Sequence, residues 1–279
     1  DVSGLPGLAF SSQLEGVGFD YRMSMGVADF WTKTLKECAD EYWSPGDIFF
    51  RLTDKRPEEQ VIAYAESHDQ AMVGDQTFLS RMVGAEIYTA MRKDLATIGV
   101  QRAVALHKII RLLTLSLAQG GYMNFMGNEF GHPEWIDFPR KGNDWSYRYA
   151  RRQWNLATDE NLVYSYLYLF DKDMINLVLE ESILDYLPQV LEQNPQTQVL
   201  AYSRGNYLFV ANFSPQNSYT DYYVNCEKGK YTIVLNTDSE KFGGFSRIHS
   251  QCTYSNNGGG LSLYLPTRTM IVLRRSDEF

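Results

Sequence analysis

The sequence predicts two kinds of fold in succession, an α/β part with a parallel sheet and then an antiparallel β-sandwich. Three observations predict this order. Short apolar runs alternate with helical patterns in the first part, as in residues 61–65 and 100–119. Polar, hydrogen-bonding residues follow directly after two of the apolar runs. Beyond residue 198 the signals are all strand-like, and Gly, Asn and Pro separate them.

The elements of the α/β part follow from local spacing. We expect a strand end at residues 18–22 and a helix over 29–39, whose apolar residues share one side. A buried strand is expected at 61–65. The segment 100–119 is apolar nearly all round, which predicts a buried helix that Gly120-Gly121 ends. The next strand is then expected at 122–126, and a further helix at 147–154.

The all-β part is expected after a break in the helical pattern at residues 187–198, which contain Pro188, Asn194 and Pro195. We therefore place an α/β domain at 1–190 and a β-sandwich at 191–279. The first two strands flank Gly205-Asn206, a dipeptide suited to a two-residue hairpin turn. The expected strands are 199–203, 207–213, 220–224, 231–235, 261–265 and 269–274.

Composition excludes several classes of protein. The net charge is −8 with dispersed basic residues, so no basic face for nucleic acid is expected. The longest mostly apolar stretch, 109–118, contains Arg111 and is too short to span a bilayer. The three cysteines lack zinc-site spacing, which predicts reduced thiols in a cytoplasmic protein. Neither a dinucleotide-binding loop nor a P-loop occurs, and we expect no cofactor and no metal.

The first candidate site follows the strand at 61–65 and contains Glu66, His68 and Asp69. An Asp just past a barrel strand can hold a carboxylate beside a reacting sugar carbon and favour an oxocarbenium-like transition state. The neighbouring His can donate to a hydroxyl of the same sugar. The other interpretation is a capping Asp beside a surface His, and the dipeptide alone does not decide between them.

A second polar cluster follows the strand expected at 122–126. Asn128 and Glu129 lie between two glycines. In one interpretation they form a pocket wall that hydrogen-bonds to other strand ends or to substrate. In the other they form a turn in which Glu129 makes an internal ion pair. Trp135 is either a stacking platform for a glucose ring or a core residue. Asp20 and Arg22 form either a sugar clamp or a local salt bridge, and Arg151-Arg152 are expected to be solvated or helix-terminal charges.

Together these segments resemble the 1,4-α-glucan branching enzymes of the α-amylase clan, and most closely the glycogen type. The similarity runs from the first residue to the last, and residues 63–70 joined to 124–135 are specific for the branching subgroup. Further matching segments lie at residues 1–4, 18–22, 137–140, 149–154 and 218–222.

This resemblance implies the C-terminal half of a (β/α)8 TIM barrel followed by the sandwich. It also implies cleavage of α-1,4-glucan chains and their re-attachment through α-1,6 linkages by a retaining double displacement. Asp69 matches the carboxylate that stabilises the transition state, and His68 matches the hydroxyl-binding histidine. The other residues expected to contact the α-glucan are Glu66, Asn128, Glu129, Trp135 and Tyr21.

The chain departs from the family pattern because it lacks the other two catalytic carboxyl groups of the family. The acid/base Glu of the family stands immediately before the Asp that matches Asp1, and the Arg-Phe-Asp-Gly type segment of the nucleophile does not occur here. We therefore expect an inactive C-terminal fragment that needs the N-terminal part of its own chain. The alternatives are an amylase-type or debranching hydrolase of the same clan and, for the isolated chain, a non-catalytic glucan-binding module.

Overall fold

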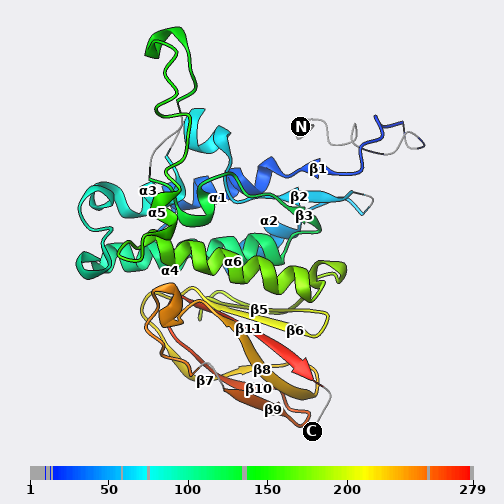
Figure 1. Ribbon diagram of the computed structural model, residues 1–279. Helices are drawn as coiled ribbons and strands as arrows, with labels where there is room; N and C mark the ends of the chain where they lie inside the picture. The colour runs from blue at the N-terminus through cyan, green and yellow to red at the C-terminus, as the bar shows by residue number, and fades with distance from the viewer. Residues whose placement is uncertain are drawn as a thin grey trace. The chain divides into compact units, whose positions relative to one another are not determined.

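The computed structural model describes residues 10, 13, 15–57, 59–73, 76–133, 137–249 and 252–276. The chain divides into two compact units, which are described separately (Figure 1). The first unit comprises residues 1–37 and 51–171, and the second comprises 38–50 and 172–279. The domain boundary expected at residue 190 stays a prediction.

A parallel three-stranded sheet organises the first unit, with its strands in the order β1-β2-β3. Arg22 of β1 pairs with Val61 of β2, and Val61 pairs in turn with Gly120 of β3. The carboxyl ends of all three strands therefore meet at one edge. The elements are β1 (Arg22–Met23), α1 (Met25–Glu37), β2 (Val61–Ala63), α3 (Phe78–Val83), α4 (Ile98–Ser116), β3 (Gly120–Tyr122) and α5 (Asn155–Thr158).

Helix α4 is the buried centre of the first unit, as its apolar pattern predicts. Thr97 caps its N-terminus by accepting a hydrogen bond from the Val100 amide at 3.2 Å. Its side chains are buried on nearly every side, including Leu106, Ile109 and Leu113. Trp31 of α1 donates through Nε1 to the Thr114 hydroxyl of α4 at 2.9 Å, which satisfies a polar atom in an otherwise apolar contact.

Two predictions for this unit are wrong in detail. The strand expected at 122–126 lies at Gly120–Tyr122. Glycine is needed inside this strand because β2 and β3 approach closely, and a Cβ at Gly121 would lie 2.6 Å from Ile62 Cδ1. The helix expected at 147–154 is a series of turns. There the Gln153 amide donates to His132 Nε2 at 3.1 Å, a bond outside any helical ladder.

The helix α6 (Tyr164–Glu180) was not predicted, although its sequence carried the signal. Tyr164, Leu167, Phe170, Met174 and Val178 recur at helical spacing, and each is buried. The division between the units falls inside this helix, after Asp171.

The second unit is built mainly of two antiparallel sheets, which confirms the antiparallel character predicted from the sequence. One sheet has six strands in the order β4-β5-β6-β11-β8-β9, and the other pairs β10 with β7 (Figure 1). Val210 and Leu273 from the first sheet share a core with Val224 and Leu263 from the second. The strands are β4 (Gln189–Asn194), β5 (Val199–Arg204), β6 (Tyr207–Asn212), β7 (Tyr219–Val224), β8 (Gly229–Asn236), β9 (Thr253–Asn256), β10 (Leu261–Leu265) and β11 (Thr269–Ser276).

The hairpin predicted around Gly205-Asn206 is present. Arg204 pairs with Tyr207, and Gly205 has a φ of 57°, the left-handed conformation that such a turn requires. The break predicted at 187–198 instead contains β4, whose residues pair with β5. The sequence did not predict this strand because β4 lies at the edge of the sheet, most of its side chains are exposed, and the alternation of its apolar residues is weak.

A segment from early in the chain, Cys38–Phe50, belongs to this second unit. Gln198 donates through Nε2 to the backbone oxygens of Asp40 at 2.8 Å and Trp43 at 3.2 Å. The Arg268 guanidinium binds the buried Asp40 carboxylate at 2.5 Å. The helix α2 (Pro45–Thr53) begins in this segment. These contacts join residues that are far apart in the sequence.

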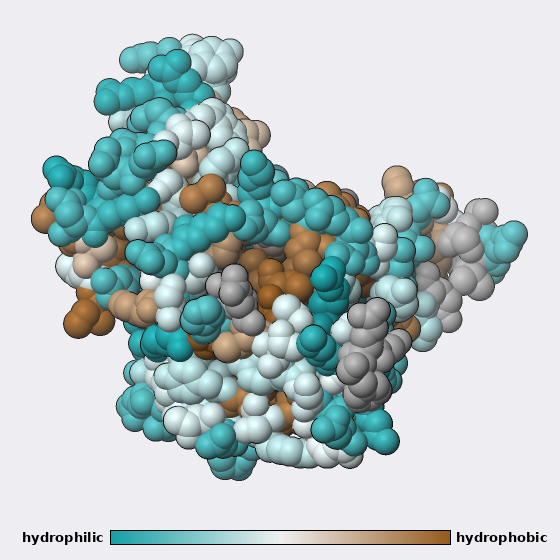
Figure 2. Space-filling model, turned by 60° about the horizontal axis from the view of Figure 1, so that its bottom comes forward, coloured by the Kyte–Doolittle hydropathy of each residue, from teal (hydrophilic) through white to brown (hydrophobic). Residues whose placement is uncertain are grey.

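The surface of the chain is mixed in polarity. Figure 2 shows apolar side chains gathered in one region of the face that it draws, with hydrophilic residues around them. Among the described residues, no helix has both the length and the apolar character that crossing a membrane requires.

Candidate functional site

The first part of the candidate site lies just beyond the carboxyl end of β2. His68 and Asp69 begin a helical turn that continues as a π-helical segment, Asp69–Val73. His68 Nε2 lies 3.2 Å from Asp69 Oδ1, and the two side chains are 53% and 47% exposed. Both side chains therefore remain accessible to a ligand, and short helical segments of this type are frequent at functional sites.

A hydrogen-bond network holds this turn in place. The Ser67 hydroxyl accepts from the Asp69 amide at 3.2 Å and donates to Gln70 Oε1 at 2.9 Å. Gln70 also donates through Nε2 to Asp29 Oδ1 of α1 at 3.0 Å. The carboxylate of Asp69 thus stands on a backbone that is tied to both the strand end and a helix.

Glu66 is buried, in contrast to its two neighbours. It is 3% exposed, and its Oε2 accepts a hydrogen bond from the Phe78 amide at 2.8 Å. Burial raises its pKa to about 7, although that hydrogen bond and the charges of Arg111 and Arg152 oppose the shift. The Glu66 carboxylate is therefore buried beneath the turn, where it binds the Phe78 amide, and it is not accessible to solvent.

We expect Glu66→Gln to stabilise the chain at high pH. The ordinary pKa of 4.5 rises to about 7 on folding, so the contribution of Glu66 to stability is present below pH 4.5 and is lost as the pH rises through about 7. Gln stays neutral and still accepts from the Phe78 amide. At pH 8 the variant should gain up to about 3 kcal/mol in the free energy of unfolding.

Urea unfolding at pH 4.5 and pH 8 checks this expectation, with Glu160→Gln as the control because that side chain is exposed. Equal effects of Glu66→Gln at both pH values would contradict it.

The second part of the site follows β3. Asn128, Glu129 and Phe130 form one 3-10 turn between Gly127 and Gly131, which adopt φ angles of 97° and 68°. Glu129 Oε2 accepts from the Gly127 amide at 2.7 Å, and burial raises its pKa. Asn128 is buried and donates through Nδ2 to the backbone oxygen of Glu66 at 3.3 Å. The structure therefore joins the ends of β2 and β3 through Asn128.

A buried ion pair lies beneath these turns, and sequence reasoning missed its role. Arg111 of α4 binds the Asp171 carboxylate through Nη2, and its Nη1 donates to Asn124 Oδ1 at 3.1 Å. Burial disfavours the charge, but Asp171 outweighs it and raises the pKa of Arg111. A charged residue inside a helix that is apolar nearly all round was the signal available in the sequence, because such charges are buried only with a partner.

Arg152 is also buried, so its assignment as a solvated charge is wrong. Its Nε donates to the backbone oxygen of Met126 at 2.8 Å, and its Nη1 lies 3.3 Å from His132 Nδ1. The guanidinium lies 5.3 Å from the centre of the Phe125 ring, which is 6.1 Å from the His68 ring. Arg152 and Phe125 therefore connect the loop after β3 to the accessible histidine.

The remaining predicted residues are spread more widely. Tyr21 precedes β1 and is 49% exposed. Arg22 pairs with Glu59 at 2.9 Å, so the predicted local pair with Asp20 is replaced by one across the sheet edge. Trp135 lies outside the described residues. Within those residues no three His, Cys, Asp or Glu side chains gather as metal ligands would.

Comparisons with known proteins agree with this architecture. Residues 191–276 match the family described as the α-amylase C-terminal all-β domain. The crystal structure of Ttha1563 from Thermus thermophilus has a TM-score of 0.55 and 20% identity, and the match covers 94% of this chain and 49% of that one. At that identity the likeness concerns the fold alone.

The curated relatives are closer in sequence. A 1,4-α-glucan-branching enzyme from Rhizophagus irregularis is 46% identical over 98% of this chain, which covers 41% of that protein. Another from Felis catus is 46% identical over 99% of the chain and 41% of its own length. The chain thus spans about two fifths of the length of the relatives it matches. It is a homologue of the C-terminal part of the 1,4-α-glucan-branching enzymes.

Proposed function

We propose that a protein containing this chain branches α-glucans, and that His68 and Asp69 form the part of its active site that this chain supplies. The observation that carries the proposal is their accessibility at the carboxyl end of β2, with 53% and 47% of their side chains exposed. The neighbouring polar residues Glu66 and Asn128 are buried and serve as supports. Homology to branching enzymes over nearly the whole chain supports the substrate class.

Asp69 would act by electrostatic stabilisation. When an α-1,4 bond breaks, positive charge develops on the sugar ring, and a carboxylate fixed beside it favours that state over the ground state. His68 would donate to a ring hydroxyl, and the half-buried Phe125 ring lies beside it as an apolar neighbour. The nucleophile and the acid/base carboxyl of the double displacement would come from residues outside these 279.

The three parallel strands support a further proposal about architecture. The observed sheet joins β1, β2 and β3 in sequential order, as successive strands of a barrel do. We infer that these strands belong to a (β/α)8 barrel that other parts of the protein complete. The candidate residues would then lie at the face of the barrel where such enzymes place their active sites.

The transfer reaction is tested by counting reducing ends. Transfer of a chain to a 6-hydroxyl creates a branch and leaves the number of reducing ends unchanged, whereas hydrolysis adds one for each bond broken. We expect the complete enzyme, acting on amylose, to give a flat reducing-end value that rises only after digestion with isoamylase. An inactive preparation with Asp69→Asn serves as the control.

The same measurement separates the two enzyme classes left open by the sequence. A steady rise in reducing ends before isoamylase would assign the protein to the hydrolases of the same clan. Binding of amylose by the isolated chain without any turnover would favour the third alternative, a non-catalytic glucan-binding module.

A further inference from the structure

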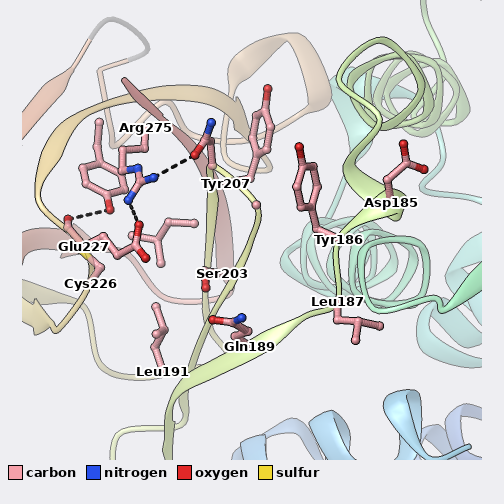
Figure 3. A pocket seen from close by; sticks show the side chains of 14 residues that line it. Asp185, Tyr186, Leu187, Gln189, Leu191, Ser203, Tyr207, Cys226, Glu227 and Arg275 are labelled. Atoms are coloured by element: carbon pink, nitrogen blue, oxygen red, sulfur yellow. Dashed lines mark hydrogen bonds and ion pairs between the residues drawn. The ribbon is translucent and has the colours of Figure 1, made fainter. Parts of the chain in front are cut away.

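A separate pocket opens within the second unit. It has a volume of about 550 Å³, inside the range of pockets that hold small molecules. Its lining comes from three places in the chain, the segment 185–191 that leads into β4, the β5–β6 hairpin and the region around Glu227 and Arg275. Figure 3 shows Tyr186 and Leu187 at one side of the pocket and Arg275 with Glu227 at the other. All of these residues belong to the second unit.

The side that carries Tyr186 is held by a buried arginine. Arg204 is 1% exposed, and it donates to the backbone oxygens of Tyr186 at 2.5 Å and Leu184 at 2.9 Å. The Tyr186 ring lies against Gly205, where an added Cβ would be 2.7 Å from the ring. The ring nevertheless stays 52% exposed. Tyr186 is thus an aromatic surface whose position is fixed before any ligand arrives, which lowers the entropic cost of binding.

The opposite side carries an ordered set of polar groups. Arg275 donates through Nη2 to Asn206 Oδ1 at 3.0 Å, and its Nη1 pairs with the Glu227 carboxylate. The Tyr231 hydroxyl donates to the backbone oxygen of Glu227 at 2.9 Å, which fixes the chain at that point. The Glu227 side chain remains 73% exposed. Planar donors and acceptors are therefore held in place, and the exposed Glu227 carboxylate has room to accept from ligand hydroxyls beside its pair with Arg275.

The chemistry of the two sides selects a neutral, hydroxyl-rich ligand. A simple anion would meet the carboxylates of Asp185 and Glu227 as well as Arg275, and an apolar ligand would remove these polar groups from water without offering them new hydrogen bonds. A sugar ring offers an apolar face for Tyr186 and vicinal hydroxyls for Asn, Arg and Glu side chains. We propose that this pocket is a non-catalytic binding site for a segment of an α-1,4-linked glucan. The identity of the sugar rests on the proposed function, whereas the pocket itself does not.

Cys226 supplies a reporter inside the pocket. Cys226 lines the cavity and is a half-buried residue whose Sγ lies 3.6 Å from Asn256 Nδ2, and Cys38 and Cys252 are also half-buried but do not line it. We expect saturating maltoheptaose to slow alkylation of Cys226 by iodoacetamide at least about three-fold, with Cys38 and Cys252 unchanged. Mass spectrometry of the labelled peptides measures all three rates in one sample. Equal rates with and without the sugar would overturn the proposal.

Substitutions then test the contacts. Tyr186→Ala should weaken binding of maltoheptaose about ten-fold by calorimetry, a typical loss for an aromatic anchor. Tyr223→Ala is the matched control, because Tyr223 is 55% exposed on β7 and does not line the pocket. Gln189→Ala, on the exposed side of β4, is the second test should Tyr186→Ala fail to fold. An unchanged affinity in a folded Tyr186→Ala or Gln189→Ala variant would refute the site.

The outcomes separate this site from the proposed active site. If His68→Ala abolishes maltoheptaose binding and Tyr186→Ala does not, the pocket proposal fails and the proposed function stands. If Cys226 is protected in an enzyme that transfers no chains, the pocket proposal stands and the proposed function fails. Protection by cellohexaose equal to that by maltoheptaose would overturn the assignment to an α-linked glucan.

Discussion

Asp69→Asn in the complete enzyme is expected to lower the rate of chain transfer about 100- to 1,000-fold, the usual loss when one well-placed electrostatic stabiliser is removed. Asn has nearly the same size and still accepts hydrogen bonds, so the fold should be unaffected. The side chain is 47% exposed, and its backbone amide is held by the Ser67 hydroxyl at 3.2 Å, a contact that the substitution leaves intact. The change therefore removes the charge and alters, among the contacts described, only the one with His68 Nε2.

Iodine absorbance and new α-1,6 linkages, followed by proton NMR, measure this rate. His68→Ala is the graded comparison, and it should reduce the rate less because it removes one hydroxyl contact and no carboxylate. Asp94→Asn is a control for the loss of a charge, since its partner Arg92 is exposed and both lie outside the candidate site. A near-normal rate for Asp69→Asn would refute the role proposed for this residue.

Asp171→Ala is expected to destabilise the chain by about 3 to 5 kcal/mol, the largest effect on stability that the structure predicts. The side chains of Arg111 and Asp171 are only 3% and 8% exposed. Removing the carboxylate leaves the Arg111 guanidinium charged in a place that water barely reaches. Its other hydrogen-bond partner, Asn124, is a neutral amide and cannot balance that charge.

Urea unfolding of the single and double variants tests this prediction. Asp94→Ala removes half of an exposed pair and should change the free energy of unfolding by less than about 1 kcal/mol. The double variant Arg111→Met with Asp171→Leu should recover most of the loss, because no uncompensated charge remains. A small effect of Asp171→Ala, comparable to that of Asp94→Ala, would disprove the importance of this pair.

The sequence predicted those parts of the fold whose pattern is local. The helix around Leu106 and the hairpin at Gly205 were found because each carries its own signal, an apolar surface in one case and a turn dipeptide in the other. The prediction of a helix at 147–154 was wrong because a tertiary contact, the hydrogen bond from the Gln153 amide to His132, determines the backbone conformation there. The edge strand β4 was not predicted because most of its side chains are exposed, so its sequence shows little apolar alternation.

The candidate site divides in the same way. The sequence predicted that His68 and Asp69 follow a strand, and the structure places them just beyond β2, whereas their roles stay a prediction. Arg111 and Arg152 were missed, because their burial depends on partners 60 and 20 residues away in the chain. The spacing of apolar residues does not reveal pairing between residues that are far apart in the sequence. A charged residue within an otherwise apolar segment is therefore the better indication of a buried, paired charge.

The segment Cys38–Phe50 has a consequence for how the protein is made. Asp40 is bound by Arg268, which follows it by 228 residues. At ribosomal speeds of about 5 to 20 residues per second, the later residue emerges roughly 10 to 45 s after the earlier one. During that time the nascent chain exposes a segment whose partners do not yet exist. Translation should therefore leave a long interval in which chaperones can bind this segment, and the second unit can be completed only after Arg268 has been synthesised.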